Sequence, residues 1–204
     1  MKDDFAKHAN KWDTEQRISR SKEFSEIIKS FLHDKKYSSA MEFGAGTGLI
    51  SFNMLDIFDK IVLVDVSEAM LAVADEKIKL NNISSVKTMN IDLSTNSIEE
   101  KFDVIYTSLA MHHVEDYKCM IKALKDHLKA GGVFIIIDLE DKNTLFHKNK
   151  DIDKEHSKDH FDGFNQEILY DYFDEIGFKN IVGENKSVKS EVGEISLLCM
   201  SAVN

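Results

Sequence analysis

The amino-acid sequence predicts a doubly wound α/β protein with a mostly parallel sheet. Strand-like and helix-like segments alternate along the chain, and the central apolar runs are uninterrupted, as in strands buried on both faces. The 204 residues, with 43% hydrophobic and 30% charged residues, are typical of a soluble globular protein. This length favours one domain over two.

The first two thirds of the chain predict five strands and four helices. The strands are expected at 38–43, 60–65, 86–92, 102–108 and 132–138. Helices are expected at 19–34, at 48–58, from Ser67 to about Asn81, and at 114–128. The first helix has one apolar face, made by Phe24, Ile27, Ile28, Phe31 and Leu32. Ser67 is a good N-cap for the third helix.

The last third predicts a charged segment, one helix and two strands. Residues 140–163 are dense in Asp, Lys and His, which indicates either a solvated connector or a mobile lid over a substrate pocket. A helix ending near Gly177 follows, and its expected apolar face holds Ile168, Leu169, Tyr172, Phe173 and Ile176. Strands at 178–184 and 195–203 then flank a polar turn and bring the expected sheet to seven strands.

Charge and composition argue against several classes of partner. The formal net charge of −10 opposes a general attraction to nucleic acid or to an anionic membrane. The N-terminus has no secretory signal, and no apolar stretch approaches the ~18 residues of a membrane span. Cys119 and Cys199 form no C-x-x-C pair and are expected to be reduced and buried. We therefore expect a cytoplasmic protein, either a monomer or a homodimer.

The most informative motif is a glycine-rich segment followed by a distant acid. Gly44, Gly46 and Gly48 come directly after an apolar run, and Asp65 ends the next apolar run 21 positions after Gly44. Glycine lets a ligand approach the backbone closely, and the amides at the start of a following helix face that ligand. An acid at the end of the second strand suits a ribose diol. The pattern predicts a nucleoside-containing cofactor at the carboxyl ends of two parallel strands.

The spacing indicates which cofactor is bound. A dinucleotide fingerprint, G-x-G-x-x-G, needs glycine at position 49, where this chain has Leu49. Glu42, two residues before the first glycine, would repel a pyrophosphate and attract an ammonium or a sulfonium. Residues 42–48 match the motif E/D-x-G-x-G-x-G, so the chain resembles the class I S-adenosylmethionine-dependent methyltransferases.

The resemblance implies a single methyltransferase domain over residues 1–204. It implies a Rossmann-like, seven-stranded sheet that closes with a C-terminal antiparallel strand. The implied parts are an N-terminal helical cap (1–36), a cofactor-binding core (37–138), a charged lid or connector (139–165) and a C-terminal helix with a strand pair (166–204). The resemblance is good over about 41–138 and looser elsewhere.

The resemblance also implies the cofactor, S-adenosyl-L-methionine, and its contacts. The glycine segment would wrap the methionine moiety, with Glu42 near its ammonium and Asp65 on both ribose hydroxyls. Asp92 and Leu93 would bind the adenine, and an N-cap role for Asp92 or Ser94 is the alternative. Met70 would line the adenine or pack in the core. The full expected set is Trp12, Arg17, Glu42, Phe43, Gly44, Ala45, Gly46, Gly48, Asp65, Val66, Met70, Asp92, Leu93, Ser108 and Met111.

Two further segments are candidates for the site. His112 and His113 are the only adjacent histidines, and an imidazole with a pKa near ~6.5 can take a proton from an O–H or N–H nucleophile. Alternatively, one of them packs or caps the next helix. In related enzymes an N-terminal aromatic–Asp pair and a basic residue fold over the cofactor. Trp12, Asp13 and Arg17 match this, with Arg17 pairing with the cofactor carboxylate, unless the segment is an ordinary solvated helix start.

Exclusions point to an O or N atom of a small molecule as the methyl acceptor. The chain has no proline, so it lacks the Asn-Pro-Pro-Tyr-type motif of enzymes that methylate bases or glutamine. Cys119 is too far along its helix to be the nucleophile of a pyrimidine enzyme. Ser108 replaces the acid through which catechol-type enzymes hold magnesium. His156 and His160 share a helical face but have no third ligand, so no metal is predicted.

Two alternative functions keep the same fold. A NAD-dependent oxidoreductase would explain Asp65 but not Glu42 or the early third glycine, and no Tyr-Lys pair for hydride transfer is found. A non-catalytic protein that binds S-adenosylmethionine is the second alternative. Cofactor binding without turnover across a broad panel of acceptors would favour it.

Overall fold

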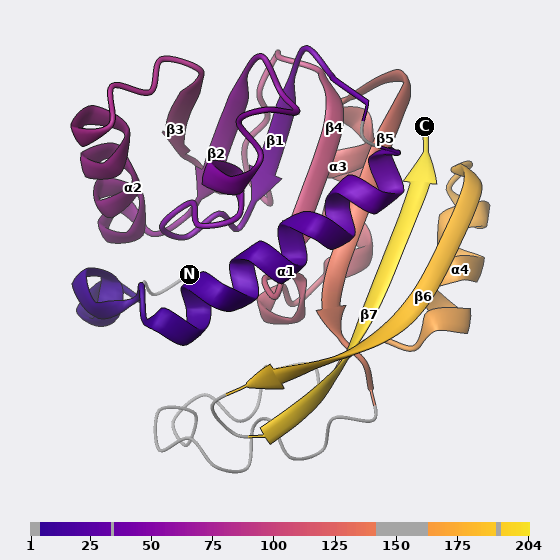
Figure 1. The fold of residues 1–204 in the computed structure, drawn as a ribbon. Helices are drawn as coiled ribbons and strands as arrows, with labels where there is room; N and C mark the ends of the chain where they lie inside the picture. The colour runs from indigo at the N-terminus through magenta and orange to yellow at the C-terminus, as the bar shows by residue number, and fades with distance from the viewer. Residues whose placement is uncertain (1–4, 34, 142–162, 191–192) are drawn as a thin grey trace.

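A computed structural model of the chain describes residues 5–33, 35–141, 163–190 and 193–204. Within these residues seven strands form one sheet in the order β3-β2-β1-β4-β5-β7-β6 (Figure 1). The strands are β1 (Ala40–Phe43), β2 (Ile61–Asp65), β3 (Val86–Asn90), β4 (Phe102–Ser108), β5 (Leu128–Leu139), β6 (Lys179–Ser190) and β7 (Gly193–Val203). The predicted α/β class is confirmed.

The sheet is parallel except at one end. β1 pairs in parallel with β2 and with β4, and the pairs β2–β3 and β4–β5 are also parallel. β7 runs antiparallel to both of its neighbours, β5 and β6, which confirms the predicted C-terminal antiparallel strand. The chain moves outward in one direction from β1 through β2 to β3, and in the other direction from β4 onward. Ligands of such sheets bind outside the carboxyl ends of the strands at this reversal.

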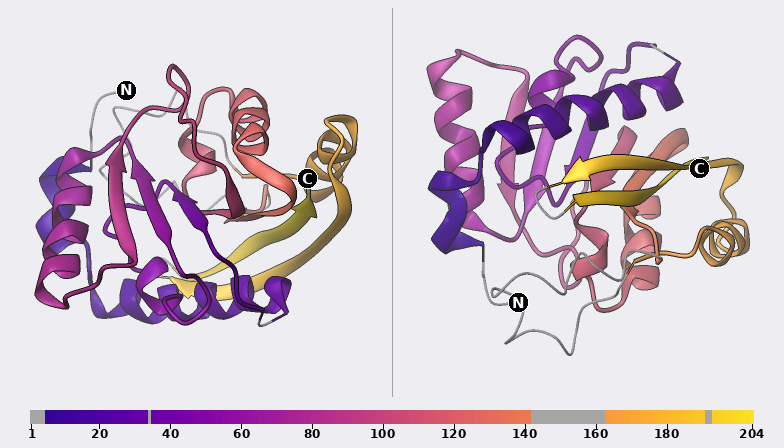
Figure 2. Two further views of the ribbon diagram at one scale, coloured as in Figure 1. Left: turned by 90° about the horizontal axis from the view of Figure 1, so that it is seen from above. Right: turned by 60° about the horizontal axis from the view of Figure 1, so that its bottom comes forward.

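Helices cover both faces of the sheet (Figures 1 and 2). They are α1 (Glu15–Leu32), α2 (Glu68–Leu80), α3 (Tyr117–Asp126) and α4 (Gln166–Glu175), with 3-10 turns η1 (Ala6–Lys11), η2 (Ser51–Asn53) and η3 (Met111–His113). Side chains of α1 and α2 pack in one apolar cluster and those of α3 and α4 in the other. Alternate residues of the central strands point to the two clusters, as Leu63 and Val64 do.

Polar caps fix where three helices begin. The side chain of Ser67 accepts a hydrogen bond from the Met70 amide at 3.3 Å, so the predicted N-cap of α2 is confirmed. Thr14 caps α1 and Asp116 caps α3 in the same way. Such a side chain satisfies a backbone N–H that has no partner within the helix.

The predicted helix at 48–58 is wrong, because only the short turn η2 forms there. The Asn53 side chain donates to the Leu49 carbonyl at 2.9 Å, which competes with helical bonding. Ile57 and Phe58 are buried, and Tyr37 pairs with Phe58 as an isolated parallel bridge, which requires an extended chain. Adjacent buried residues in an extended segment therefore replace the one-faced spacing of a helix.

Two expectations about burial are also wrong. Ile168 is 56% exposed, although Leu169, Tyr172 and Phe173 of α4 are buried as predicted. Cys119 is an exposed free thiol, whereas Cys199 is free and buried. The burial of Met120 and Ile121 turns the Cys119 side of α3 outward.

Part of the charged segment lies outside the described residues. The expected lid or connector at 140–163 falls mostly there, together with His156 and His160. In the described ranges no helix is long and apolar enough to cross a membrane. The division of the domain into a cap, core, lid and C-terminal part stays a prediction.

The backbone at Gly48 generates a prediction about stability. Gly48 has φ +77°, and an added Cβ would lie 2.8 Å from Leu63 Cδ1 and 3.1 Å from Phe52 Cε2. Gly131 has a similar φ of +75°, but nothing lies within 4 Å of its added Cβ. We expect Gly131→Ala to lower the free energy of unfolding by about 1 kcal/mol, through backbone strain alone. We expect Gly48→Ala to cost roughly 1–3 kcal/mol more, through overpacking. Urea denaturation checks this, and equal costs would contradict the packing argument.

Candidate functional site

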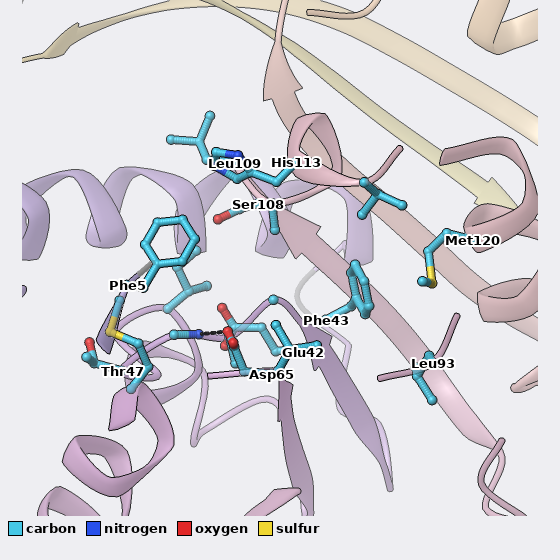
Figure 3. Close-up of a pocket in the computed structure, with 18 of the residues that line it drawn as sticks. Phe5, Glu42, Phe43, Thr47, Asp65, Leu93, Ser108, Leu109, His113 and Met120 are labelled. Atoms are coloured by element: carbon cyan, nitrogen blue, oxygen red, sulfur yellow. Dashed lines mark hydrogen bonds between the residues drawn. The ribbon is translucent and has the colours of Figure 1, made fainter. Parts of the chain in front are cut away.

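A pocket with a cavity volume of about 550 Å³ lies at the carboxyl ends of β1, β2 and β4 (Figure 3). It is also lined by the segment after β3 and by residues of α1 and α3. Most of the residues that the sequence predicts as cofactor contacts line it. They are Trp12, Arg17, Glu42, Phe43, Gly44, Ala45, Gly46, Asp65, Val66, Met70, Asp92, Leu93 and Ser108. Of the two predicted catalytic residues, His113 lines the pocket and His112 does not.

The glycine loop is shaped by contacts on both of its sides. Gly44 has φ +69°, and an added Cβ would lie 2.3 Å from the Cβ of Ala110 in the loop after β4. Its amide and that of Ala45 donate to the Val64 carbonyl of β2, at 2.9 and 3.1 Å. Gly48 does not line the pocket as predicted, because it packs against Leu63 and Phe52. Around Gly46 the first atom an added Cβ would meet is Met70 Cε, 3.8 Å away, so ligand atoms can approach the backbone there.

Asp65 joins this loop to the start of α2. One oxygen of its carboxylate accepts a hydrogen bond from the Gly46 amide at 2.7 Å. The other oxygen accepts from the Ser67 amide at 2.8 Å. These two bonds hold the carboxylate at the pocket wall, at the end of β2, where the sequence predicts it.

Glu42 lies under the loop in a buried polar cluster that the sequence did not reveal. Its side chain accepts a hydrogen bond from the Ser51 hydroxyl, which also lies 2.7 Å from the Tyr106 hydroxyl. Glu42 is only 3% exposed, yet it lines the pocket. Burial raises the pKa of its carboxyl to about 8, against a smaller lowering by the Ser51 hydrogen bond. Tyr106 occupies a position in an apolar strand, where the sequence signals packing only.

Asp92 caps a turn and also lines the pocket. One oxygen of its carboxylate accepts from the Ser94 amide at 2.9 Å and from the Ser94 hydroxyl at 2.6 Å, so it caps a local turn. These bonds lower the pKa of Asp92. The residue also lines the pocket, as does the buried Leu93 beside it. Met70 is likewise both 3% exposed and a lining residue.

The N-terminal segment is anchored to the glycine loop. The Thr47 hydroxyl donates to Asp13 at 2.5 Å, and Lys77 of α2 forms an ion pair with Asp13. Lys77 also donates to the Thr47 carbonyl at 2.8 Å. This arrangement rules out an ordinary solvated helix start. The sequence did not predict the roles of Thr47 and Lys77, because these roles depend on contacts between distant parts of the chain.

Trp12 and Arg17 lie close to Asp13 in the sequence, and both line the pocket. The guanidinium of Arg17 lies 4.0 Å from the centroid of the Trp12 ring. One of its nitrogens donates to the Trp12 carbonyl at 3.0 Å. The stacking and the hydrogen bond fix both side chains relative to each other.

The expected pocket contacts of Met111 and His112 are wrong. Met111 is fully buried and His112 is 3% exposed, and neither lines the pocket. The His112 ring nitrogen Nδ1 lies 2.6 Å from Asp138, which also accepts from the amides of both residues at 2.9 and 3.3 Å. The buried Asp138 at the end of β5 thus holds the turn η3 and draws these two residues inward. Of the two adjacent histidines, His112 is therefore the one that packs inside the protein.

The turn places His113 at the pocket wall instead (Figure 3). Its ring centroid lies 4.0 Å from that of His112 and 5.5 Å from that of Phe5. Phe5 in turn contacts Trp12 edge to face, with centroids 5.7 Å apart. A row of aromatic rings therefore joins the N-terminal segment to the end of β4.

Comparisons with known proteins find similarity to methyltransferases. A family model described as a methyltransferase domain matches residues 41–134. An uncharacterized methyltransferase of Schizosaccharomyces pombe is 29% identical over 147 residues, which are 68% of this chain and 51% of that protein. A malonyl-[acyl-carrier protein] O-methyltransferase of Bacillus anthracis is 28% identical, over 55% of this chain and 46% of that protein. The chain spans about half the length of these curated relatives.

Solved structures share the fold. Phosphoethanolamine N-methyltransferase 2 of Haemonchus contortus, in complex with S-adenosyl-L-methionine, superposes with a TM-score of 0.70 at 18% identity, over 87% of this chain and 51% of that one. The N-methyltransferase NodS of Bradyrhizobium japonicum, in complex with S-adenosyl-l-homocysteine, superposes with a TM-score of 0.69 at 16% identity, over 100% and 93%. The predicted Rossmann-like methyltransferase fold is confirmed.

The buried Glu42 generates a prediction about pH. Its pKa of about 8 in the folded chain exceeds the ordinary value of 4.5, so the folded state binds the proton more tightly than the unfolded state. This contribution to stability is complete below about pH 4.5 and is lost as the pH rises to about 8. Between about pH 5.5 and 7.5, Glu42 should lower the unfolding free energy of the parent chain by about 1 kcal/mol per pH unit. Glu42→Gln should abolish this decrease. Urea denaturation across that range measures it.

The exposed Glu23 of α1 offers a matched control for this experiment. Glu23→Gln removes the same charge from a solvated site and should leave the pH dependence as in the parent chain. Parallel stability curves for the parent chain and Glu42→Gln would contradict the assignment.

Proposed function

We propose that this chain is a class I S-adenosylmethionine-dependent methyltransferase, which transfers a methyl group to an O or N atom of a small-molecule acceptor. One observation carries the proposal. The loop from Gly44 to Gly48 lies between two acidic side chains, Glu42 and Asp65, at the ends of adjacent strands beside the pocket.

The residues of the pocket fit S-adenosylmethionine better than a dinucleotide. Glu42 and Asp65 suit the ammonium and the ribose diol, and Asp92 suits the exocyclic amine of adenine. A pyrophosphate would need cationic or amide groups at the glycine loop. Lys77, the lysine nearest that loop, is already bound to Asp13 and to the Thr47 carbonyl. The acidic side chains beside the glycine loop therefore favour the methyl donor over NAD.

The remaining contacts are assigned by position. Gly46 gives close access to the backbone, and Arg17 would bind the carboxylate of the cofactor by charge-assisted hydrogen bonds. Val66, Met70 and Leu93 would lie against the adenine. Met111 and Gly48 support the site from behind, through packing.

The chemistry needs alignment more than it needs a reactive side chain. The bound cofactor supplies a methyl group on a positively charged sulfur, which is already activated as a leaving group. The chain holds the acceptor in line with that methyl group, an effect worth up to roughly 7–11 kcal/mol. Phe5 and Trp12 line the pocket and help to exclude water. His113 lies at the same wall, where it would take the proton that the acceptor loses.

The named relatives support O and N atoms as acceptors, because they include an O-methyltransferase and N-methyltransferases. The net charge of −10 opposes nucleic acid as the acceptor. A cytoplasmic location and a monomeric or homodimeric state remain predictions from the sequence.

Asp65 provides the first test of the cofactor. We expect calorimetric titration to give micromolar dissociation constants for S-adenosylmethionine and S-adenosylhomocysteine, and no comparable binding of NAD. Asp65→Ala should weaken the first two by about 100-fold, because two charge-assisted hydrogen bonds to the ribose are lost. The exposed Asp59 gives a control variant, Asp59→Ala, which should bind as the parent chain does.

Asp65 also ties the glycine loop to α2, so its loss can loosen the fold. Asp65→Asn keeps one acceptor oxygen, and thermal unfolding of both variants separates stability from binding. Binding of NAD alone, or of none of the three ligands by a folded parent chain, would rule out the proposed function.

His113 provides the test of proton transfer. With an acceptor found by screening for release of S-adenosylhomocysteine, His113→Gln should lower kcat by about 100-fold, because a general base is lost. Its dissociation constant for S-adenosylhomocysteine should change little. The exposed His8 supplies a control, His8→Gln, with unchanged kcat. An unchanged kcat in His113→Gln would remove His113 from the mechanism and leave alignment as the main catalytic effect.

A further inference from the structure

The arginines of this chain are unusually placed. The sequence contains only two, Arg17 and Arg20, and every other basic residue besides histidine is lysine. Both arginines lie on α1, and both line the pocket. Their spacing of three positions puts them on the same side of the helix, one turn apart.

The charges of the pocket are divided between its walls. The carboxylates of Glu42, Asp65 and Asp92 line it from the ends of the strands and the segment after β3, and Glu115 and Asp116 line it near α3. The two guanidinium groups line it from α1. An acidic chain with a net charge of −10 repels anions in general, so this wall offers a local exception.

The chemistry of arginine limits the chemical class of the ligand. A guanidinium is planar and always charged, and it presents donors in a fork that matches a carboxylate or a phosphate. Two guanidinium groups would not strengthen the binding of a neutral or cationic acceptor in a pocket whose other charged residues are acidic. An exposed lysine would serve solubility equally well, and the chain uses lysine elsewhere.

The two arginines occupy different places along α1. Arg17 lies in the first turn, stacked on Trp12, next to the anchor between Asp13 and the glycine loop. Arg20 lies one turn further along, with its guanidinium 5.9 Å from the centroid of the Phe24 ring. Ser21 and Phe24 line the pocket beside it. We therefore assign the cofactor carboxylate near the glycine loop to Arg17, which leaves Arg20 as the second arginine of the pocket lining.

We propose that Arg20 binds an anionic group, a carboxylate or a phosphate, on the methyl acceptor. This inference rests on the proposed function and specifies the class of its substrate. The acceptor is thus a small acid whose nucleophilic O or N atom is held at the methyl group while its charge rests on α1.

Trp12 supplies a direct signal of binding, because it is the only tryptophan of the chain and it lines the pocket. Its fluorescence would be followed while protein saturated with S-adenosylhomocysteine is titrated with two matched pairs of probes. Benzoate against benzamide tests a carboxylate, and phenyl phosphate against phenol tests a phosphate. We expect at least one anion to bind about 10-fold more tightly than its neutral partner, in line with a charge-assisted hydrogen bond. The pair that shows the preference identifies which anion is recognised.

Variants of α1 test the residue itself. Arg20→Gln should remove the preference for the anion, Arg20→Lys should keep part of it, and neither should change the dissociation constant of S-adenosylhomocysteine more than about two-fold. Lys22 is exposed on the same helix and does not line the pocket, so Lys22→Gln is the matched control and should keep the full preference.

Three results would overturn the inference. They are equal binding of both members of each pair, an anion preference that survives in Arg20→Gln, and weakened binding of S-adenosylhomocysteine in that variant, which would give Arg20 to the cofactor. Failure of the parent chain to bind S-adenosylhomocysteine at all is a different result, because it would contradict the proposed function.

Discussion

The carboxylate of Asp65 is the interaction on which the site depends. It accepts one backbone amide from the glycine loop and one from the start of α2, so it joins the segments that follow two adjacent strands. The reversal of chain direction between β1 and β4 makes room for this junction, because neighbouring connections leave the sheet on opposite faces there. Loop, helix and pocket wall are positioned together as a result.

A buried carboxylate, Asp138, organises the pocket wall that follows β4. Asp138 receives three hydrogen bonds from Met111 and His112, and so determines which of two adjacent histidines reaches the pocket. Glu42 is different, because its hydroxyl partner Ser51 only partly offsets the loss of water. Each of these acids does its work through neighbours that lie far away in the sequence.

The sequence predicted what depends on local patterns. Apolar runs predicted the strands, and Ser67 predicted the start of α2. The spacing of Gly44 and Asp65 predicted the position of the pocket. It could not separate His112 from His113, because their roles depend on Asp138, some 26 positions away. It also missed Thr47, Lys77 and Tyr106, since a hydroxyl or an ammonium shows its partner only after the chain has folded.

The position of the two arginines outside both apolar clusters has an evolutionary consequence. The clusters involve side chains between the sheet and its helices, whereas Arg17 and Arg20 stand on a partly exposed side of α1. Surface substitutions of this kind usually change folding free energy by less than about 0.5 kcal/mol. Descendants of one ancestral gene can therefore exchange Arg20 and acquire new substrates while inheriting an unchanged scaffold.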